Sequence, residues 1–205
     1  MTMQSLTSYL SNLYTQTALP DSLSRRQELV REMQYLEGKT IHCFTCPGTC
    51  CTQAANSMLI TPIEALEILA ALKTENFNNI ELQSLKDHLS DTVKNYRLNV
   101  EIYTGKKNKS GLRKTYTCPF FNNGILGCSL SRSSKPYGCL GFNPKTSEDN
   151  GKSCSSNILL LNNREDTFQL SEEAANNQIR LDLNLDWDKQ NIPQALLDVL
   201  ENIKN

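Results

Sequence analysis

Long apolar runs are missing from this chain of 205 residues. No stretch of about 18 consecutive apolar residues occurs, so we expect no membrane-spanning helix. Residues 1–13 contain neither a basic side chain nor an apolar run of signal-peptide length, and we therefore expect no export. These absences predict a reducing, cytoplasmic location, in which cysteine patterns bind metal or catalyse more often than they form disulfides. Four disulfides in a secreted protein are the less favoured alternative.

Histidine and nucleotide-binding motifs are also scarce. His42 and His88 are the only histidines, which gives little support to a hydrolase built on cysteine and histidine. The chain has no phosphate-binding loop and no glycine fingerprint for dinucleotides. A net charge of −1 argues against nucleic acid as a partner, although seven Lys or Arg and a single acid gather between Lys94 and Lys114. That basic segment is interpreted as a solvated turn, with a site for an anionic partner as the less favoured alternative.

Cysteine, in contrast, is abundant, and half of it stands in one block. Four of the eight cysteines follow the spacing Cys-x2-Cys-x3-Cys-Cys within nine residues, and the Pro47-Gly48 turn can bring their sulfurs together. Thiolates at this density favour zinc, iron–sulfur clusters or copper(I). We predict a metal centre, with no catalytic residue assigned, and the predicted ligands are Cys43, Cys46, Cys50, Cys51, Cys118, Cys128, Cys139 and Cys154.

How the eight thiols divide among metal sites stays open. They fit two four-thiolate zinc sites, one or two four-cysteine iron–sulfur clusters, or a polynuclear site with bridging thiolates. Cys50 and Cys51 are adjacent and are expected to point in different directions, so they suit two metals, or one ligates while the other packs. His42 could replace a thiolate ligand, but a polar neighbour without a metal role is favoured. Glu64 is interpreted as a helix-capping partner, with a carboxylate near the metal as the alternative.

Apolar residues recur at helical spacing over much of the chain. Thr61-Pro62-Ile63-Glu64 is typical of a capping box with proline at the first helical position. Ser22 or Ser24 can cap the second helix, and Gly38 can end it. Helices are expected at 1–19, 22–38, 62–72, 82–93 and 193–203, with a further helix opening at Ser171.

Strand signals are weaker and shorter. Apolar and polar residues alternate over 98–102, so the segment 98–117 is expected to form a hairpin with a basic tip at Lys106–Lys114. The short apolar run 158–161 is expected to be a core strand.

The single cysteines lie in less regular sequence. An Asn-Asn-Gly turn signal can bring Cys118 and Cys128 near each other. Residues 129–157 are expected to form a long irregular loop that metal–thiolate bonds pin. The whole predicts an α+β fold, mainly α-helical, with amphipathic helices around a cysteine-rich, metal-pinned loop region and one or two short β-hairpins. Its expected parts are an N-terminal helical arm (1–39), a cysteine-cluster metal-binding domain (40–157) and a C-terminal strand/helix segment (158–205) packed on the same domain.

The cysteine block resembles the defining motif of a known family. Its spacing is similar to that of the CxxCxxxCC family of YkgJ-type cysteine-cluster proteins, which are described as zinc- or iron-chelating domains. The family's second segment runs Cys-Pro-Phe-Leu, Gly-x-Cys, Arg-Pro and Cys-Arg-x-Phe. This chain is similar to it at Cys118-Pro119-Phe120-Phe121, Gly127-Cys128, Lys135-Pro136, Cys139 and Phe142, with Cys154 as a last cysteine.

The resemblance covers about residues 40–155 and departs from the family in detail. Lys135 and Leu140 stand where the family has arginines, and the spacing from Cys128 to Lys135 is one residue longer. The resemblance implies metal binding through the cysteines and assigns no reaction. A domain of this kind also occurs in flagellin lysine N-methylases, so it implies an enzymatic role as an alternative.

Three hypotheses about function follow. The first is a cytoplasmic metal-binding protein, with an iron–sulfur cluster or iron slightly preferred over zinc, that acts in electron transfer, metal or redox sensing, or metal handling. The second is a cluster-dependent enzyme, such as a lysine N-methylase-like protein or an oxidoreductase. The third is a zinc-stapled interaction module that meets a protein partner through the basic hairpin or the terminal helices.

Overall fold

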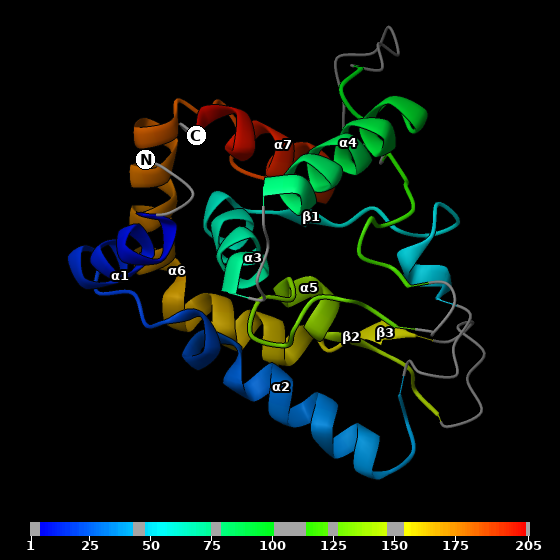
Figure 1. The fold of residues 1–205 in the computed structure, drawn as a ribbon. Coiled ribbons are helices and arrows are strands. Elements are labelled where there is room, and N and C mark those ends of the chain that lie inside the picture. The colour runs from blue at the N-terminus through cyan, green and yellow to red at the C-terminus, as the bar shows by residue number, and fades with distance from the viewer. Residues whose placement is uncertain are drawn as a thin grey trace, which may run out of the picture.

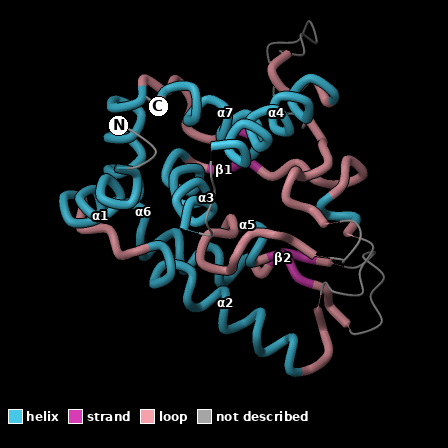
Figure 2. The backbone as a smooth tube through the Cα atoms, in the orientation of Figure 1, coloured by secondary structure: helices cyan, strands magenta, loops and turns pink. Residues whose placement is uncertain are grey.

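The computed structural model describes residues 5–42, 48–74, 79–100, 114–122, 127–146 and 154–203. Helices make up most of these residues (Figure 1), and two small antiparallel sheets lie among them (Figure 2). The expected α+β class, mainly α-helical, is therefore confirmed. The helices are α1 (Leu6–Gln16), α2 (Ser22–Gly38), a 3₁₀ turn (Thr49–Cys51), α3 (Pro62–Thr74), α4 (Asn79–Asn95), α5 (Tyr137–Leu140), α6 (Ile158–Leu183) and α7 (Ile192–Asn202).

Helix α3 lies at the centre of the fold (Figure 1). The predicted capping box starts it, because the Thr61 N–H and hydroxyl both donate to the Glu64 carboxylate, at 3.0 and 3.1 Å. Pro62 occupies the first helical position, where no N–H is needed. Most of the helix is buried, and it packs against α1, α6 and α7. The capping role of Glu64 is thus confirmed.

Helices α1 and α2 lie where their apolar spacing predicts them, but the ends of α2 differ from the expectation. The Asp21 carboxylate accepts the Ser24 N–H at 2.9 Å, so Asp21 is the cap rather than Ser22 or Ser24. Gly38 is the last helical residue of α2, and Thr40, with a φ of 62°, adopts the left-handed conformation beyond it.

Helix α6 replaces two expected features. The apolar run 158–161 is its first turn and not a core strand, and Ser171 lies inside the helix rather than at its start. The Asn157 side chain caps it by accepting the Leu160 N–H at 3.2 Å. The first two residues of the run are more than half exposed, which a buried strand would not allow. Four apolar residues suit a strand or a helix end equally, and the Asn157 cap favours the helix.

One of the two sheets joins segments that are distant in the sequence, and the other joins two ends of one stretch. β1 (Leu59–Ile60) pairs antiparallel with β4 (Gln190–Asn191). β2 (Phe142–Asn143) pairs antiparallel with β3 (Ser155–Ser156). The expected irregular loop 129–157 is therefore partly regular, because it contains α5, β2 and β3.

The hairpin expected over 98–117 is not present in the part of it that the structure describes. Residues 96–100 form turns after α4, and residues 114–118 belong to no strand. The Lys114 ammonium donates to the Leu98 carbonyl at 2.6 Å, so the two ends of the segment meet without a strand ladder. Residues 101–113, which hold most of the expected basic tip, lie outside the described residues.

The C-terminal helix α7 is present as expected. The Asn191 side chain caps it by accepting the Gln194 N–H at 3.0 Å, and Pro193 lies in its first turn. α7 packs against α3 and α4 and buries most of its apolar face there. None of the helices among the described residues combines the length and apolarity that crossing a membrane requires.

Candidate metal centre

Five of the six cysteines that the structure describes line one cavity of about 770 Å³. Cys154 does not line it, and Cys43 and Cys46 lie outside the described residues. The structure therefore joins the end of the cysteine block to most of the single cysteines, although the two groups are far apart in the sequence. The lining thiols are Cys50, Cys51, Cys118, Cys128 and Cys139.

Backbone contacts hold the end of the cysteine block in place. Gly48 has a φ of 71°, and a Cβ there would lie 2.3 Å from the Phe121 ring, so the position requires glycine. The following 3₁₀ turn places the Cys50 and Cys51 sulfurs 3.9 Å apart, so they share one space rather than pointing in different directions. The Cys51 carbonyl accepts the Cys118 N–H at 2.8 Å. That bond ties the first group of cysteines to the second.

A chain reversal brings Cys118 toward Cys128, as the Asn-Asn-Gly signal predicts. Phe121 and Cys128 form an antiparallel bridge, and the Ser129 N–H donates to the Phe120 carbonyl at 2.9 Å. The charge that the Cys128 thiolate would carry raises the pKa of Cys118, after the larger effect of burial. The expected approach of these two thiols is therefore confirmed.

Cys139 reaches the cavity from the short helix α5. The Cys139 N–H donates to the Pro136 carbonyl at 3.0 Å, which forms the first turn of this helix. A Cβ at the neighbouring Gly138 would lie 2.7 Å from the Met58 sulfur. Glycine at this position therefore lets α5 lie close to Met58, in the segment that precedes α3, and this places Cys139 at the cavity wall.

The environment of the thiols favours their protonated forms in the absence of a metal. Burial raises the pKa of Cys118 to about 12. Burial also raises the pKa of Cys139 well above its usual range, with further contributions from Cys118 and Cys128. The hydrogen bond to Cys51, followed by burial, raises the pKa of Cys50. A metal ion would reverse this balance, since thiolates are the form that binds metal.

The thiols fit a metal centre in their chemistry, but those that the structure describes do not form a coordination sphere. Within the described ranges, no group of three or more cysteine, histidine, aspartate or glutamate side chains is arranged to hold a metal ion. What the structure shows is a shared wall of soft donors. His42 also lines this cavity, whereas Glu64 is used as a cap.

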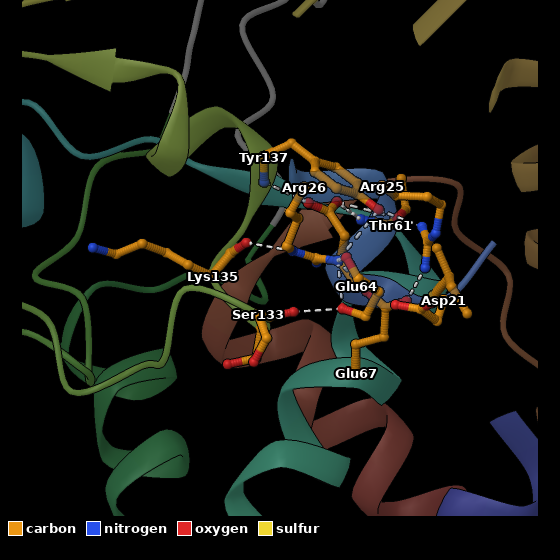
Figure 3. Close-up of polar contacts among 12 residues, drawn as sticks. Asp21, Arg25, Arg26, Thr61, Glu64, Glu67, Ser133, Lys135 and Tyr137 are labelled. Atoms are coloured by element: carbon orange, nitrogen blue, oxygen red, sulfur yellow. Dashed lines mark hydrogen bonds and ion pairs between the residues drawn. The ribbon is translucent and has the colours of Figure 1, made fainter. Parts of the chain in front are cut away.

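Figure 3 shows a buried ion network that the sequence reasoning missed. It reaches the cavity wall through Lys135. Arg25 and Arg26 project from α2 and both pair with Glu67 of α3; the Arg26–Glu67 distance is 2.7 Å. Arg25 also pairs with Glu172 at 2.6 Å, and the Tyr137 hydroxyl donates to Glu172 at 2.9 Å. Burial by itself raises the pKa of Glu67, but the charges of Arg26 and Arg25 outweigh it and lower that pKa.

The network and its neighbours hold the segment that leads to Cys139. The Arg26 guanidinium donates to the Lys135 carbonyl at 2.9 Å. The second oxygen of Glu64 accepts the Tyr137 N–H at 3.0 Å, so the cap of α3 also fixes the start of α5. A signal existed in the sequence: Arg26 precedes Leu29 and Met33 at helical spacing, on the apolar face of α2. An arginine on an apolar face predicts a buried acidic partner.

Comparisons with family models, with curated proteins and with solved structures found no match for this chain. The resemblance to the CxxCxxxCC family therefore stays a prediction.

Proposed function

We propose that this protein binds a metal ion or metal cluster through cysteine thiolates. The observation that carries the proposal is the gathering of five cysteines from two distant segments at one cavity. Thiols that merely fill a core have no reason to converge on one space, because a free cysteine packs as an ordinary small apolar side chain. Soft thiolate donors at this density are typical of zinc, iron–sulfur or copper(I) sites.

The residues that would hold the metal are the lining thiols together with the predicted ligands of the cysteine block. A bound iron–sulfur cluster would supply one-electron chemistry, whereas zinc would supply structural cross-links. We keep the slight preference for iron and a role in redox chemistry, metal sensing or metal handling. A cytoplasmic location belongs to the proposal, since a reducing compartment keeps thiols available for metal.

Anaerobic purification with elemental and sulfide analysis tests the proposal. We expect stoichiometric metal in the wild-type protein and most of it lost in Cys118→Ser and Cys139→Ser. Cys154→Ser makes the same change at a cysteine that does not line the cavity, and its metal content tells whether the site extends that far. Iron with acid-labile sulfide indicates a cluster, iron without sulfide indicates a thiolate-bound iron site, and zinc indicates structural sites. Wild-type protein without stoichiometric metal would contradict the proposal.

The size of the cavity favours a second candidate, an enzyme that carries out its reaction beside the metal centre. A volume of about 770 Å³ lies in the range of cavities that hold organic molecules, so one metal ion would fill only part of it. The polar groups on its wall are thiols, a few amides and hydroxyls, and charged side chains such as Lys135. Calorimetric titration with S-adenosylmethionine tests the methylase form of this candidate, and absence of heat from the metal-loaded protein would count against it.

A further inference from the structure

Lys135 joins the buried ion network to the thiol cavity. Its carbonyl faces Arg26, while its side chain extends away from the network, as Figure 3 shows. The same residue lines the cavity together with the five thiols. It is half-buried, so its ammonium is partly shielded from water.

The ammonium of Lys135 is not paired with a carboxylate in the part of the chain that the structure describes. Among the described residues, no aspartate or glutamate forms an ion pair with it. The nearby cation on the cavity wall, Arg132, is already paired with Glu37. Lys189 also lines the cavity, but it is exposed to solvent. Partial burial of an ammonium without a nearby anion costs free energy, so a negative charge close to Lys135 would stabilise the folded protein.

The thiols are the groups that can supply this charge. Lys135 lines the same cavity as the thiols of both segments, Cys50 and Cys51 from the cysteine block and Cys118, Cys128 and Cys139 from the second segment. A nearby ammonium favours the thiolate form of cysteine, which is the form that binds metal. A divalent ion with four thiolate ligands carries about two net negative charges, and a cation beside such a centre offsets part of that charge.

We propose that Lys135 is the counter-ion of the thiolate-bound metal, held toward the cavity by Arg26. The assignment rests on the proposed metal-binding function. Three backbone features fix the approach of the side chain. The Lys135 N–H donates to the Ser131 carbonyl at 2.9 Å, its carbonyl accepts from Arg26 at 2.9 Å, and the following Pro136 restricts the chain. Arg26 is held in turn by Glu67.

The test compares Lys135→Met with Lys135→Arg, using competition with a chelator for the metal that the wild-type protein carries. Methionine keeps the backbone contacts and most of the volume, but removes the charge. We expect the metal affinity of Lys135→Met to fall by about tenfold, the usual effect of losing an outer-sphere partner. We expect Lys135→Arg to stay within about threefold of the wild type, because it restores the charge. If the metal is a redox-active iron centre, the midpoint potential of Lys135→Met should also fall, since a nearby cation stabilises the more negative, reduced form.

Lys94→Met is the matched control, because Lys94 is exposed on α4 and does not line the cavity. It should leave metal affinity and potential unchanged. Circular dichroism and thermal unfolding of each metal-free variant check that it folds, and Lys135→Gln replaces Lys135→Met if that variant does not. If Lys135→Met binds metal as tightly as the wild type, the counter-ion role of Lys135 is overturned and the proposed metal binding stands. A wild-type protein that binds no metal would overturn the proposed function, and the role of Lys135 with it.

Discussion

The ion network and the thiol cavity both bring polar groups together inside the molecule, but they differ in how their charges are paired. In the network, Arg25 and Arg26 are paired with carboxylates of α3 and α6. In the cavity, five thiols and the ammonium of Lys135 face one space, and no carboxylate of the described residues pairs with that ammonium. A cluster whose charges pair with one another stabilises the scaffold. A cavity lined by thiol donors and by an ammonium without a carboxylate partner among the described residues is complementary to a ligand, which is why we assign function to the second region only.

Glu67→Gln should have the largest effect of the changes considered, because it removes the carboxylate that both arginines share. Leaving buried charge without its partner costs about 3–5 kcal/mol of unfolding free energy. Denaturant unfolding of the wild type and the variant measures the loss. Asp188→Asn is the control: it breaks the pair with Arg180 at a carboxylate that is 84% exposed, and should cost less than about 1 kcal/mol. Similar losses in the two variants would mean that the network is not a major source of stability.

Metal binding should have the next largest effect on the unfolding free energy, and this effect should depend on the thiols of the cavity. At a free metal concentration of a hundred times Kd, binding to the native state adds about 2.7 kcal/mol to the unfolding free energy. Thermal unfolding with and without a chelator measures this gain. In Cys139→Ser most of the gain should vanish, whereas in Glu67→Gln, if it folds, it should persist. If metal raises the unfolding free energy of Cys139→Ser as much as that of the wild type, Cys139 is not a metal ligand.

Gly48→Ala should destabilise the cavity wall by a smaller amount. The added Cβ would meet the Phe121 ring, and alanine is strained at a φ of 71°, which costs about 1–2 kcal/mol. Gly38→Ala is the matched control, because that glycine ends α2 and a Cβ there has no neighbour within 4 Å. It should be neutral or stabilise the protein by up to about 1 kcal/mol. Denaturant unfolding of both variants gives the comparison, and equal effects would show that the left-handed turn is not needed.

Changes of pH should give the smallest effects on stability. The ion network should lose stability as the pH falls, whereas the cavity should bind metal more tightly as the pH rises. Glu67 has a folded-state pKa below its ordinary value of 4.5, so its contribution is present above that pH and is lost as the pH falls toward the folded-state pKa. The stability gap between the wild type and Glu67→Gln should therefore narrow below about pH 4.5.

The cavity should respond at higher pH. Because the pKa values of Cys118 and Cys139 are raised, metal must displace protons from them, and metal affinity should rise with pH across the neutral range. Chelator competition at several pH values measures this. A metal affinity that is independent of pH would contradict thiol ligation by these residues.

Local signals predicted much of the helical framework. Apolar spacing located α1, α3, α4 and α7, and the Thr61–Glu64 capping box was identified from four consecutive residues. Such features depend on neighbours within one or two turns, so sequence alone is sufficient for them. The expectation of a strand at 158–161 is wrong because four apolar residues show no period, and the Asn157 cap decides in favour of a helix.

Features that join distant segments were not predictable in this way. Nothing near Leu59 indicates that it pairs with Asn191, and nothing near Arg25 identifies Glu172 as its partner. These pairings depend on how α2, α3 and α6 pack, which no local period encodes.

The sequence by itself determined which ligand chemistry is available, namely eight thiols, four of them in one block. It also determined where most of the helices form. Only the tertiary structure decided which thiols share a space, and that Lys135 stands among them. The physical reason is that ligand type follows from side-chain composition, whereas the convergence of ligands follows from packing between elements that are distant in the chain.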